Sequence, residues 1–294
     1  MRRHYARSRT VDDVTANDVI GATRDPSYDT LDVYRDGPVG WLIFDRPDAA
    51  NAMDATMLAE LERAWLELDA DPEVRVVVNT GNGAAFQTGL DVRQLARDRD
   101  ALREQSRRTR NATLKLTAWH NQVWKPVIAA VNGVCAGGGL HFVSDADIVI
   151  AAPEATFLDP HVSIGQVSAF ETIALAQTSP TEAIMRMALM GRYERIDAAR
   201  AYELGILSEV VARQDGLRTR AQELAETIAR NSPAAMAATK RALWGALELG
   251  LTDACRAGAQ ELVGMWGHPD QTEGPAAFAE KREPVWAPPS APTR

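Results

Sequence analysis

The spacing of hydrophobic positions changes along the chain in a way that separates strands from helices. Over Asp54–Ala70, apolar side chains recur at helical spacing behind Asp54, a suitable N-cap, which predicts a helix packed on the core. Short runs rich in β-branched residues predict buried strands instead. These runs are Val39–Phe44, Val74–Val78, Val127–Val131 and Asp147–Ala151.

Helical spacing dominates the last third of the chain. Leu217, Ala221, Leu224 and Ile228 predict one amphipathic helix, and a second begins with Ser232 as cap and Pro233 in its first turn and stops at Gly250. The order of elements therefore predicts an α/β core over residues 26–210 and a helical C-terminal region over 211–286. Residues 1–25 are expected to form a flexible tail, and the Pro-rich residues 287–294 a disordered tip.

Composition narrows the class of protein. A chain of 294 residues with 46% hydrophobic content can bury a large core. The net charge of -8 argues against nucleic acid or an anionic membrane as a partner. The uncharged stretch Pro126–Ser144 contains too many glycines for a membrane helix. Two cysteines are too few for a disulfide framework, and the basic N-terminus lacks the apolar segment of a secretory signal, so we expect a cytoplasmic protein.

Two Gly-rich segments, Gly81–Asp91 and Asn132–His141, each follow a predicted strand. Glycine lets the backbone approach a ligand closely, and free N–H groups at a helix start attract an anion or a developing oxyanion. Two such loops could converge two backbone donors on one carbonyl oxygen. The alternative is that the glycines serve only tight packing of strand against helix. The glycine fingerprints of nucleotide-binding loops are absent.

Several segments occur in an order that carries a family resemblance. They are Arg46–Met53, Thr80–Gly81 with Phe86–Asp91, Lys125–Gly139, Gly191–Ile206 and Phe278–Arg282. Together, over residues 30 to 286, they resemble the crotonase superfamily of enoyl-CoA hydratases and isomerases. The resemblance implies an α/β fold, a spiral of repeated ββα units with a helical C-terminal region that mediates oligomerisation. It also implies a homotrimer or a dimer of trimers, a role in fatty acid metabolism, and an acyl-CoA thioester as substrate. No cofactor beyond the CoA of the substrate, and no metal, is expected.

The resemblance also implies positions for the site. The oxyanion donors fall on the backbone N–H groups of Leu90 and Gly138. Lys281 would meet a phosphate of CoA, often one bound to a neighbouring subunit, although a solvated surface charge is the alternative. The positions expected to bind CoA or substrate are Arg46, Ala52, Phe86, Thr88, Asp91, Gly137, Phe278 and Lys281.

The chain departs from the family at its two catalytic glutamates, where it has His141 and His161. One neutral and one protonated imidazole can divide acid and base work near neutral pH, because two adjacent imidazolium ions repel. Glu171 lies where several family members place a further catalytic acid, although it could simply be a carboxylate at a helix start. Asp159 could orient His161, but capping of the turn before Pro160 is the simpler interpretation.

These residues favour an enoyl-CoA hydratase-like lyase. In this hypothesis His161 transfers the α-proton and His141 positions or activates water. The same residues could instead serve retro-Claisen hydrolysis of a carbon–carbon bond in a β-diketone, or enoyl-CoA isomerisation. A third class is a non-catalytic acyl-CoA binding module. A metal site at the two histidines is disfavoured because the sequence shows no third ligand.

Overall fold

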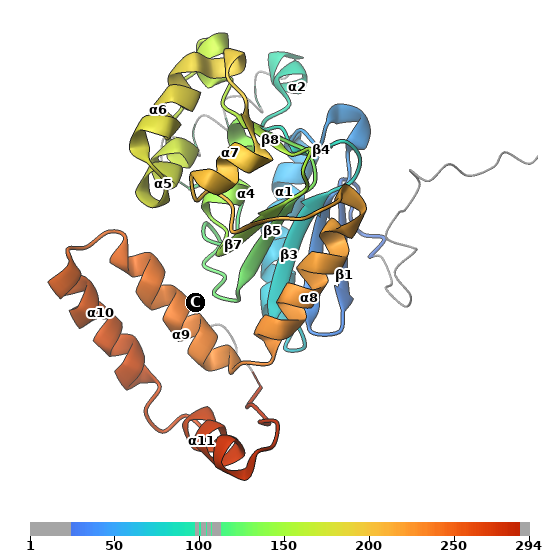
Figure 1. Cartoon of the computed structure of the whole chain (residues 1–294). Coiled ribbons are helices and arrows are strands. Elements are labelled where there is room, and N and C mark those ends of the chain that lie inside the picture. Colours follow the sequence, from blue (N-terminus) through green and yellow to red (C-terminus); the bar gives the residue numbers. More distant parts are fainter. Residues whose placement is uncertain (1–24, 98–99, 101–103, 105–106, 108–112, 289–294) are drawn as a thin grey trace, which may run out of the picture.

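The computed structural model describes residues 25–288 apart from 98–99, 101–103, 105–106 and 108–112 (Figure 1). The predicted N-terminal tail lies outside the described residues except for Asp25, whose N–H donates to Val33 O at 3.3 Å. Only Ala287 and Pro288 of the predicted C-terminal tip are described.

Two sheets form the core. The larger has the strand order β1 (Leu31–Asp36), β2 (Val39–Phe44), β3 (Val76–Gly81), β5 (Val127–Val131), β7 (Ile148–Ala151) and β10 (Glu209–Val210). The smaller has the order β4 (Ala85–Gln87), β6 (Val134–Ala136), β8 (Thr156–Leu158) and β9 (Ile196–Asp197). Neighbouring strands run parallel except for the β1–β2 and β8–β9 pairs.

The chain winds repeatedly from the larger sheet to the smaller one. Strands β3, β5 and β7 are each followed by a strand of the small sheet, and then by α2 (Val92–Arg97), α4 (His141–Ser144) and α5 (Phe170–Thr178) respectively. This is the expected spiral of ββα units. Because β4, β6 and β8 are parallel neighbours, the segments that follow them emerge at one edge of the small sheet. The Gly-rich loops and the turn before His161 are these segments.

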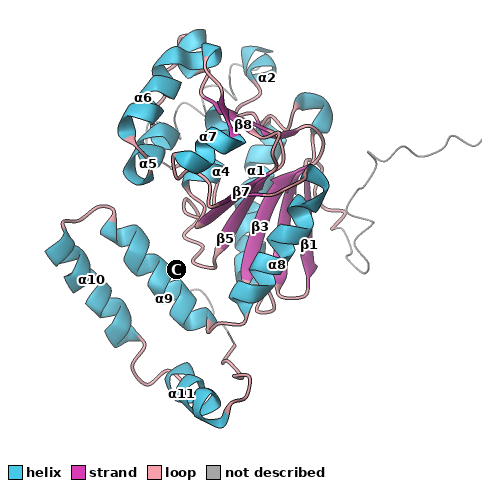
Figure 2. Cartoon of the chain, viewed as in Figure 1, coloured by secondary structure: helices cyan, strands magenta, loops and turns pink. Residues whose placement is uncertain are grey.

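Helices cover both faces of the larger sheet (Figure 2). On one face, α1 (Ala55–Ala70) buries Met57 and Trp65, and its predicted cap is present, since Asp54 accepts a hydrogen bond from Met57 N at 2.8 Å. On the other face, α8 (Leu217–Ala229) buries Leu217 and Ala221. A sheet covered on both faces has strands that are apolar throughout, which is why β2 and β5 were evident as continuous apolar runs.

Several predicted boundaries were wrong, including the end of β3 at Gly81 instead of Val78 and the start of β7 at Ile148 instead of Asp147. Strand β3 begins at Val76 because the N–H of Val74 closes a turn onto Asp71 O at 3.2 Å after α1. Helix α9 (Pro233–Ala246) begins at the predicted cap, but tight i to i+3 hydrogen bonds end it before Gly250, which instead caps α10 (Leu251–Gly264).

The C-terminal helices extend away from the sheets (Figure 1). Helix α9 is anchored by Lys240, whose ammonium lies 2.7 Å from Asp147 Oδ2 and donates to Lys125 O at 2.9 Å. Further α-helices are α6 (Thr181–Met190), α7 (Ala198–Glu203) and α11 (Asp270–Glu280). Among the described residues, none of the helices has the length and apolar character needed to cross a membrane.

Candidate active site

The two predicted oxyanion loops lie against each other. A Cβ atom built on Gly138 would lie 3.9 Å from Leu90 N, and one built on Gly89, which has φ +85°, would lie 2.8 Å from Gly138 N. Leu90 forms a parallel bridge with Met53 that uses Gly89 O and Asp91 N, so its own N–H points away from Met53. Gly138 is the second residue of the 3₁₀ helix Gly137–Leu140, where an N–H has no partner inside the helix.

Other glycines of these segments serve packing. A Cβ atom at Gly139 would lie 2.1 Å from Gln87 O, a contact that no side chain can make. The side chain of Asn132 also ties the loops together, because its Oδ1 accepts from Gly81 N at 3.0 Å and its Nδ2 donates to Gly83 O at 3.0 Å. The packing interpretation therefore holds at Gly139, and the oxyanion donors at Leu90 and Gly138 stay a prediction.

The three predicted catalytic side chains meet beside these loops. His141 begins α4, His161 begins the 3₁₀ helix His161–Ile164 after β8, and Glu171 lies in the first turn of α5. The buried carboxylate of Glu171 lies between the two imidazoles, with Oε1 3.2 Å from His161 Nδ1 and Oε2 3.5 Å from His141 Nε2. A Cβ atom on Gly137 would lie 3.4 Å from His161 Cε1, so this ring adjoins the oxyanion loop.

Asp159 orients His161 and also caps the turn. Its Oδ1 accepts hydrogen bonds from His161 Nδ1 at 2.6 Å and from the backbone N–H of His161 at 3.0 Å. Ser168, which no sequence pattern singled out, donates to the other carboxylate oxygen. Because Nδ1 of His161 faces Asp159 and Glu171, Nε2 on the opposite side of the ring is the nitrogen available to a substrate.

Burial and neighbouring groups shift the pKa values of His141, His161 and Glu171 from their ordinary values. Burial lowers the pKa of His141 to about 3, so this ring is neutral at physiological pH. The hydrogen bond to Asp159 raises the pKa of His161 even though burial opposes it. Burial raises the pKa of Glu171. The raised pKa of His161 favours the protonated ring, which can give a proton, and the neighbouring Glu171 carboxylate can take a proton when it is ionised.

A second buried group lies behind His141. The rings of His120 and His141 meet edge to face, with centroids 5.3 Å apart and planes at 67°. His120 is linked through Thr117 to the buried carboxylate of Asp145. His120 lies outside the segments that carry the family resemblance, so no sequence pattern pointed to it.

Two sets of residues could be considered as metal ligands. In each set, His120 with His141 and Asp145, or Asp159 with His161 and Glu171, one ligand atom per residue lies within 4.8 Å of the others. The structure thus supplies the third group that the sequence did not show. However, two ligands ~2.1 Å from a tetrahedral ion are roughly 3.4 Å apart. The 2.6 Å contact between Asp159 and His161 has the length of a hydrogen bond instead. The metal-free site stays a prediction.

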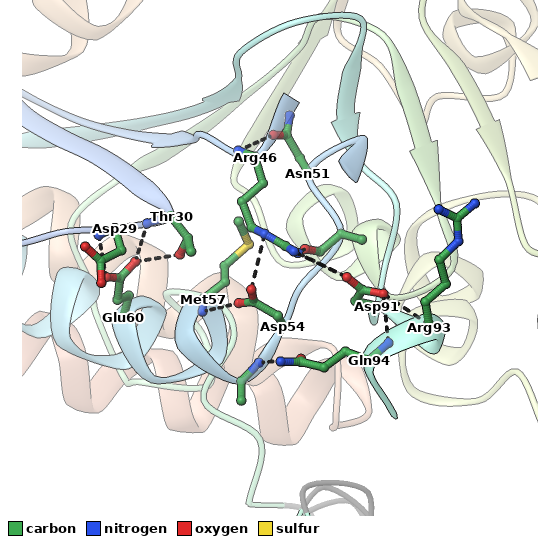
Figure 3. A network of polar contacts seen from close by, with 12 residues as sticks. Asp29, Thr30, Arg46, Asn51, Asp54, Met57, Glu60, Asp91, Arg93 and Gln94 are labelled. Atoms are coloured by element: carbon green, nitrogen blue, oxygen red, sulfur yellow. Dashed lines mark hydrogen bonds and ion pairs between the residues drawn. The ribbon is translucent and has the colours of Figure 1, made fainter. Parts of the chain in front are cut away.

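Arg46 and Asp91 form a network that holds the first oxyanion loop (Figure 3). The Arg46 guanidinium lies 3.2 Å from Asp54 Oδ2 and 3.3 Å from Asp91 Oδ2, and it donates to Ala52 O. Asp91 Oδ1 accepts from Arg93 N at 3.1 Å. These contacts position Asp91, the residue that follows Leu90. A direct contact of Arg46, Ala52 or Asp91 with substrate stays a prediction.

Comparison with known proteins assigns the chain to a family. Residues 36–289 match the family described as Enoyl-CoA hydratase/isomerase. The chain belongs to this family. It is 34% identical to a probable enoyl-CoA hydratase of Mycobacterium bovis, and also 34% identical to a carnitinyl-CoA dehydratase of Citrobacter koseri. Each alignment covers 88% of this chain and 98% of the relative.

Solved structures agree with the family assignment. An enoyl-CoA hydratase/isomerase from Mycobacterium paratuberculosis superposes with a TM-score of 0.77 at 37% identity, covering 89% of this chain and 99% of that one. An enoyl-CoA hydratase from Bacillus anthracis gives a TM-score of 0.80 at 28% identity, covering 88% and 99%. The expected crotonase fold, the acyl-CoA-acting class and the lyase type are confirmed, and the exact reaction is left open.

Two residues that were expected to contact the substrate, Phe86 and Thr88, make contacts within the protein. The side chain of Phe86 is completely buried and packs edge to face on Phe44, with ring centroids 5.4 Å apart. The expected contact of Phe86 with a substrate stays a prediction. Thr88 Oγ1 donates to Ala50 O at 2.9 Å.

Within one chain, Phe278 and Lys281 do not lie beside His141 and His161. Phe278 is 88% exposed on α11, and Lys281 follows the end of that helix with φ +54°. Figure 1 places α11 at the opposite end of the molecule from α4 and α5. Their contact with CoA, expected at a neighbouring subunit's site, stays a prediction.

Proposed function

We propose that this enzyme adds water to, or removes it from, the double bond of an enoyl-CoA thioester. The observation that carries the proposal is the Glu171 carboxylate held between His141 and His161, beside the adjoining backbone donors of Leu90 and Gly138. The two N–H groups would stabilise the thioester oxygen as it becomes enolate-like. The remaining chemistry is one proton taken from water and one proton given to the α-carbon.

The contacts assign the roles in this proposal. In hydration, Glu171 takes a proton from water as the oxygen attacks the β-carbon, and the electrons move onto the thioester oxygen. Nε2 of His161 then gives its proton to the α-carbon. The 3.2 Å contact places the Glu171 carboxylate beside Nδ1 of His161, where its charge favours the protonated ring. After each turnover Glu171 releases its proton to solvent, and Nε2 of His161 takes up a proton from solvent. His141, neutral and buried, supports the carboxylate instead of activating water itself.

The relatives support water addition or removal over other reactions of the family. They include proteins named as a probable enoyl-CoA hydratase, a carnitinyl-CoA dehydratase and, from Thauera aromatica, an (E)-benzylidenesuccinyl-CoA hydratase at 32% identity. All three names describe the gain or loss of water. Under this proposal CoA enters as part of the substrate and no separate cofactor is needed.

The direct test is mass spectrometry of enoyl-CoA and β-keto-CoA panels incubated with the protein. We expect an enoyl-CoA to gain one water. Uptake of water with carbon–carbon cleavage would replace the proposal with a hydrolase. No mass change on any substrate would refute water addition, and would turn attention to isomerisation or to a binding module.

The assignment of Glu171 is tested by Glu171→Gln, which keeps the shape of the side chain but cannot take a proton. We expect kcat to fall by about 10²- to 10⁴-fold, the usual contribution of a general acid or base. Glu182→Gln is the matched control, because Glu182 is exposed in the first turn of the next helix, α6. Equal activity of the two variants would show that Glu171 is not the base.

We also propose that the protein forms a homotrimer or a dimer of trimers in the cytoplasm. Large apolar side chains on the C-terminal helices support the assembly, since Leu251, Leu262 and Phe278 are more than two-thirds exposed in the single chain. Cys135 and Cys255 are both free thiols, which suits a reducing compartment. Light scattering should give three or six times the chain mass of 32.0 kDa.

A further inference from the structure

Four polar side chains form a hydrogen-bonded chain behind the active site, and three of them, Thr117, Ser144 and Asp145, are buried. Thr117 Oγ1 donates to Asp145 Oδ2 at 2.7 Å and lies 2.9 Å from His120 Nδ1. Ser144 Oγ donates to the other oxygen, Asp145 Oδ1, at 2.8 Å. Asp145 directly follows α4, the helix that His141 begins. The chain of contacts therefore joins the segment before β5 to the helix that carries an active-site histidine.

The hydrogen bonds determine which nitrogen of His120 carries the proton. A threonine hydroxyl has one hydrogen, and an ionised carboxylate can only accept, so Thr117 gives its hydrogen to Asp145. The lone pair of the hydroxyl must then accept from Nδ1–H of His120. His120 is therefore held as the tautomer protonated at Nδ1, and its Nε2 carries a lone pair.

His120 in turn supports His141. Their rings pack edge to face at 5.3 Å, and a nitrogen of each ring lies within 4.8 Å of an Asp145 oxygen and of the other. At the same time Nε2 of His141 lies 3.5 Å from the Glu171 carboxylate. The His141 ring is therefore held between His120 on one side and the Glu171 carboxylate on the other, and Glu171 is the base of the proposed reaction.

We propose that Thr117, His120 and Asp145 are positioning residues for the active site: they fix the tautomer of His120 and, through its ring, the orientation of His141 beside Glu171. The inference rests on the proposed function for its kinetic consequence, but its structural content is independent of any reaction. None of the three needs to contact a substrate. Their loss should therefore lower kcat and leave KM nearly unchanged.

The test uses a matched pair of substitutions at one position. Thr117→Val keeps the shape of the side chain and removes the hydroxyl, whereas Thr117→Ser keeps the hydroxyl and removes the methyl group. ¹⁵N NMR of histidine-labelled protein reports the tautomers of His120 and His141 directly. We expect the wild type and Thr117→Ser to show His120 protonated at Nδ1 alone, and Thr117→Val to show a mixture of tautomers and an altered His141 signal.

Enoyl-CoA hydration kinetics provide the second readout. We expect kcat of Thr117→Val to fall about tenfold, below the ~100-fold loss that a 1 Å displacement of reacting groups can cause, with KM within twofold. If Thr117→Val does not fold, His120→Phe keeps the ring packing without Nδ1 and should give the same kinetic split. Ser144→Ala, which removes the hydrogen bonds of Ser144 to Asp145 and to the backbone oxygen of His141, should leave the His120 tautomer unchanged.

The two readouts separate this inference from the proposed function. An unchanged His120 tautomer in Thr117→Val would overturn the inference whatever the enzyme catalyses. Equal kcat values for Thr117→Val and Thr117→Ser would overturn its kinetic part. A wild-type protein that hydrates no enoyl-CoA would refute the proposed function, while the tautomer measurement would still decide the inference.

Discussion

The substitution Asp159→Asn tests how the site controls the proton on His161. Asparagine keeps the size of the side chain, and its Oδ1 can still accept from the backbone N–H of His161, so the turn before Pro160 should persist. What is lost is the negative charge opposite His161 Nδ1, where the carboxylate lies at 2.6 Å. The variant thereby separates the two roles of Asp159.

The size of the effect follows from that hydrogen bond. A hydrogen bond to a charged group contributes about 1.5–3 kcal/mol. If the transition state loses all of it, kcat falls by roughly 10- to 150-fold. The pH profile should move as well, because Asp159 is the main cause of the raised pKa of His161. Removing the charge lowers that pKa, so the alkaline limb, where His161 loses its catalytic proton, should shift to lower pH.

The assay is the pH dependence of kcat and kcat/KM for enoyl-CoA hydration, with thermal unfolding to check the fold. Ser168→Ala is the control, because it removes a hydrogen bond to Asp159 and leaves its charge. If Asp159→Asn keeps kcat within a factor of two and its alkaline limb does not move, the assignment of His161 as the proton donor is incorrect.

Three stability measurements test the packing and electrostatics. Gly139→Ala should lower the free energy of unfolding by about 1–3 kcal/mol, because the new Cβ would overlap a backbone carbonyl. Gly245→Ala in α9, where the space is open, should raise it by about 0.5–1 kcal/mol. Equal unfolding midpoints for the two variants would contradict this reasoning. Lys240→Met should cost about 3–5 kcal/mol in denaturant unfolding by leaving Asp147 without its cation, and adding Asp147→Asn should restore part of the loss. Because the folded pKa of His141 is about 3, the unfolded chain takes up a proton below pH ~6.5 that the folded chain does not. Stability should therefore fall on acidification, and His141→Gln should flatten the slope by up to about 1.4 kcal/mol per pH unit; an unchanged slope would show that the buried ring is not neutral.

The sequence by itself determined the elements and much of the site. Strand β2 and strand β5 have the predicted bounds, and the cap of α1 at Asp54 is present, because local apolar spacing and a capping side chain act within a few residues. The family motifs also pointed to His141 and His161, because each of these residues follows a strand and a turn whose own residues form the motif.

The tertiary structure alone decided how these groups interact. Glu171 lies on a helix start, His161 on a 3₁₀ turn and His120 on an irregular segment, and no spacing in the chain gives the distances between them. Those distances follow from the side-by-side order of β4, β6 and β8, which is set by long-range strand pairing. The same packing buries His141 and places Asp159 against His161. Because burial and charged neighbours set a pKa, the division of acid and base roles could not be derived from the sequence.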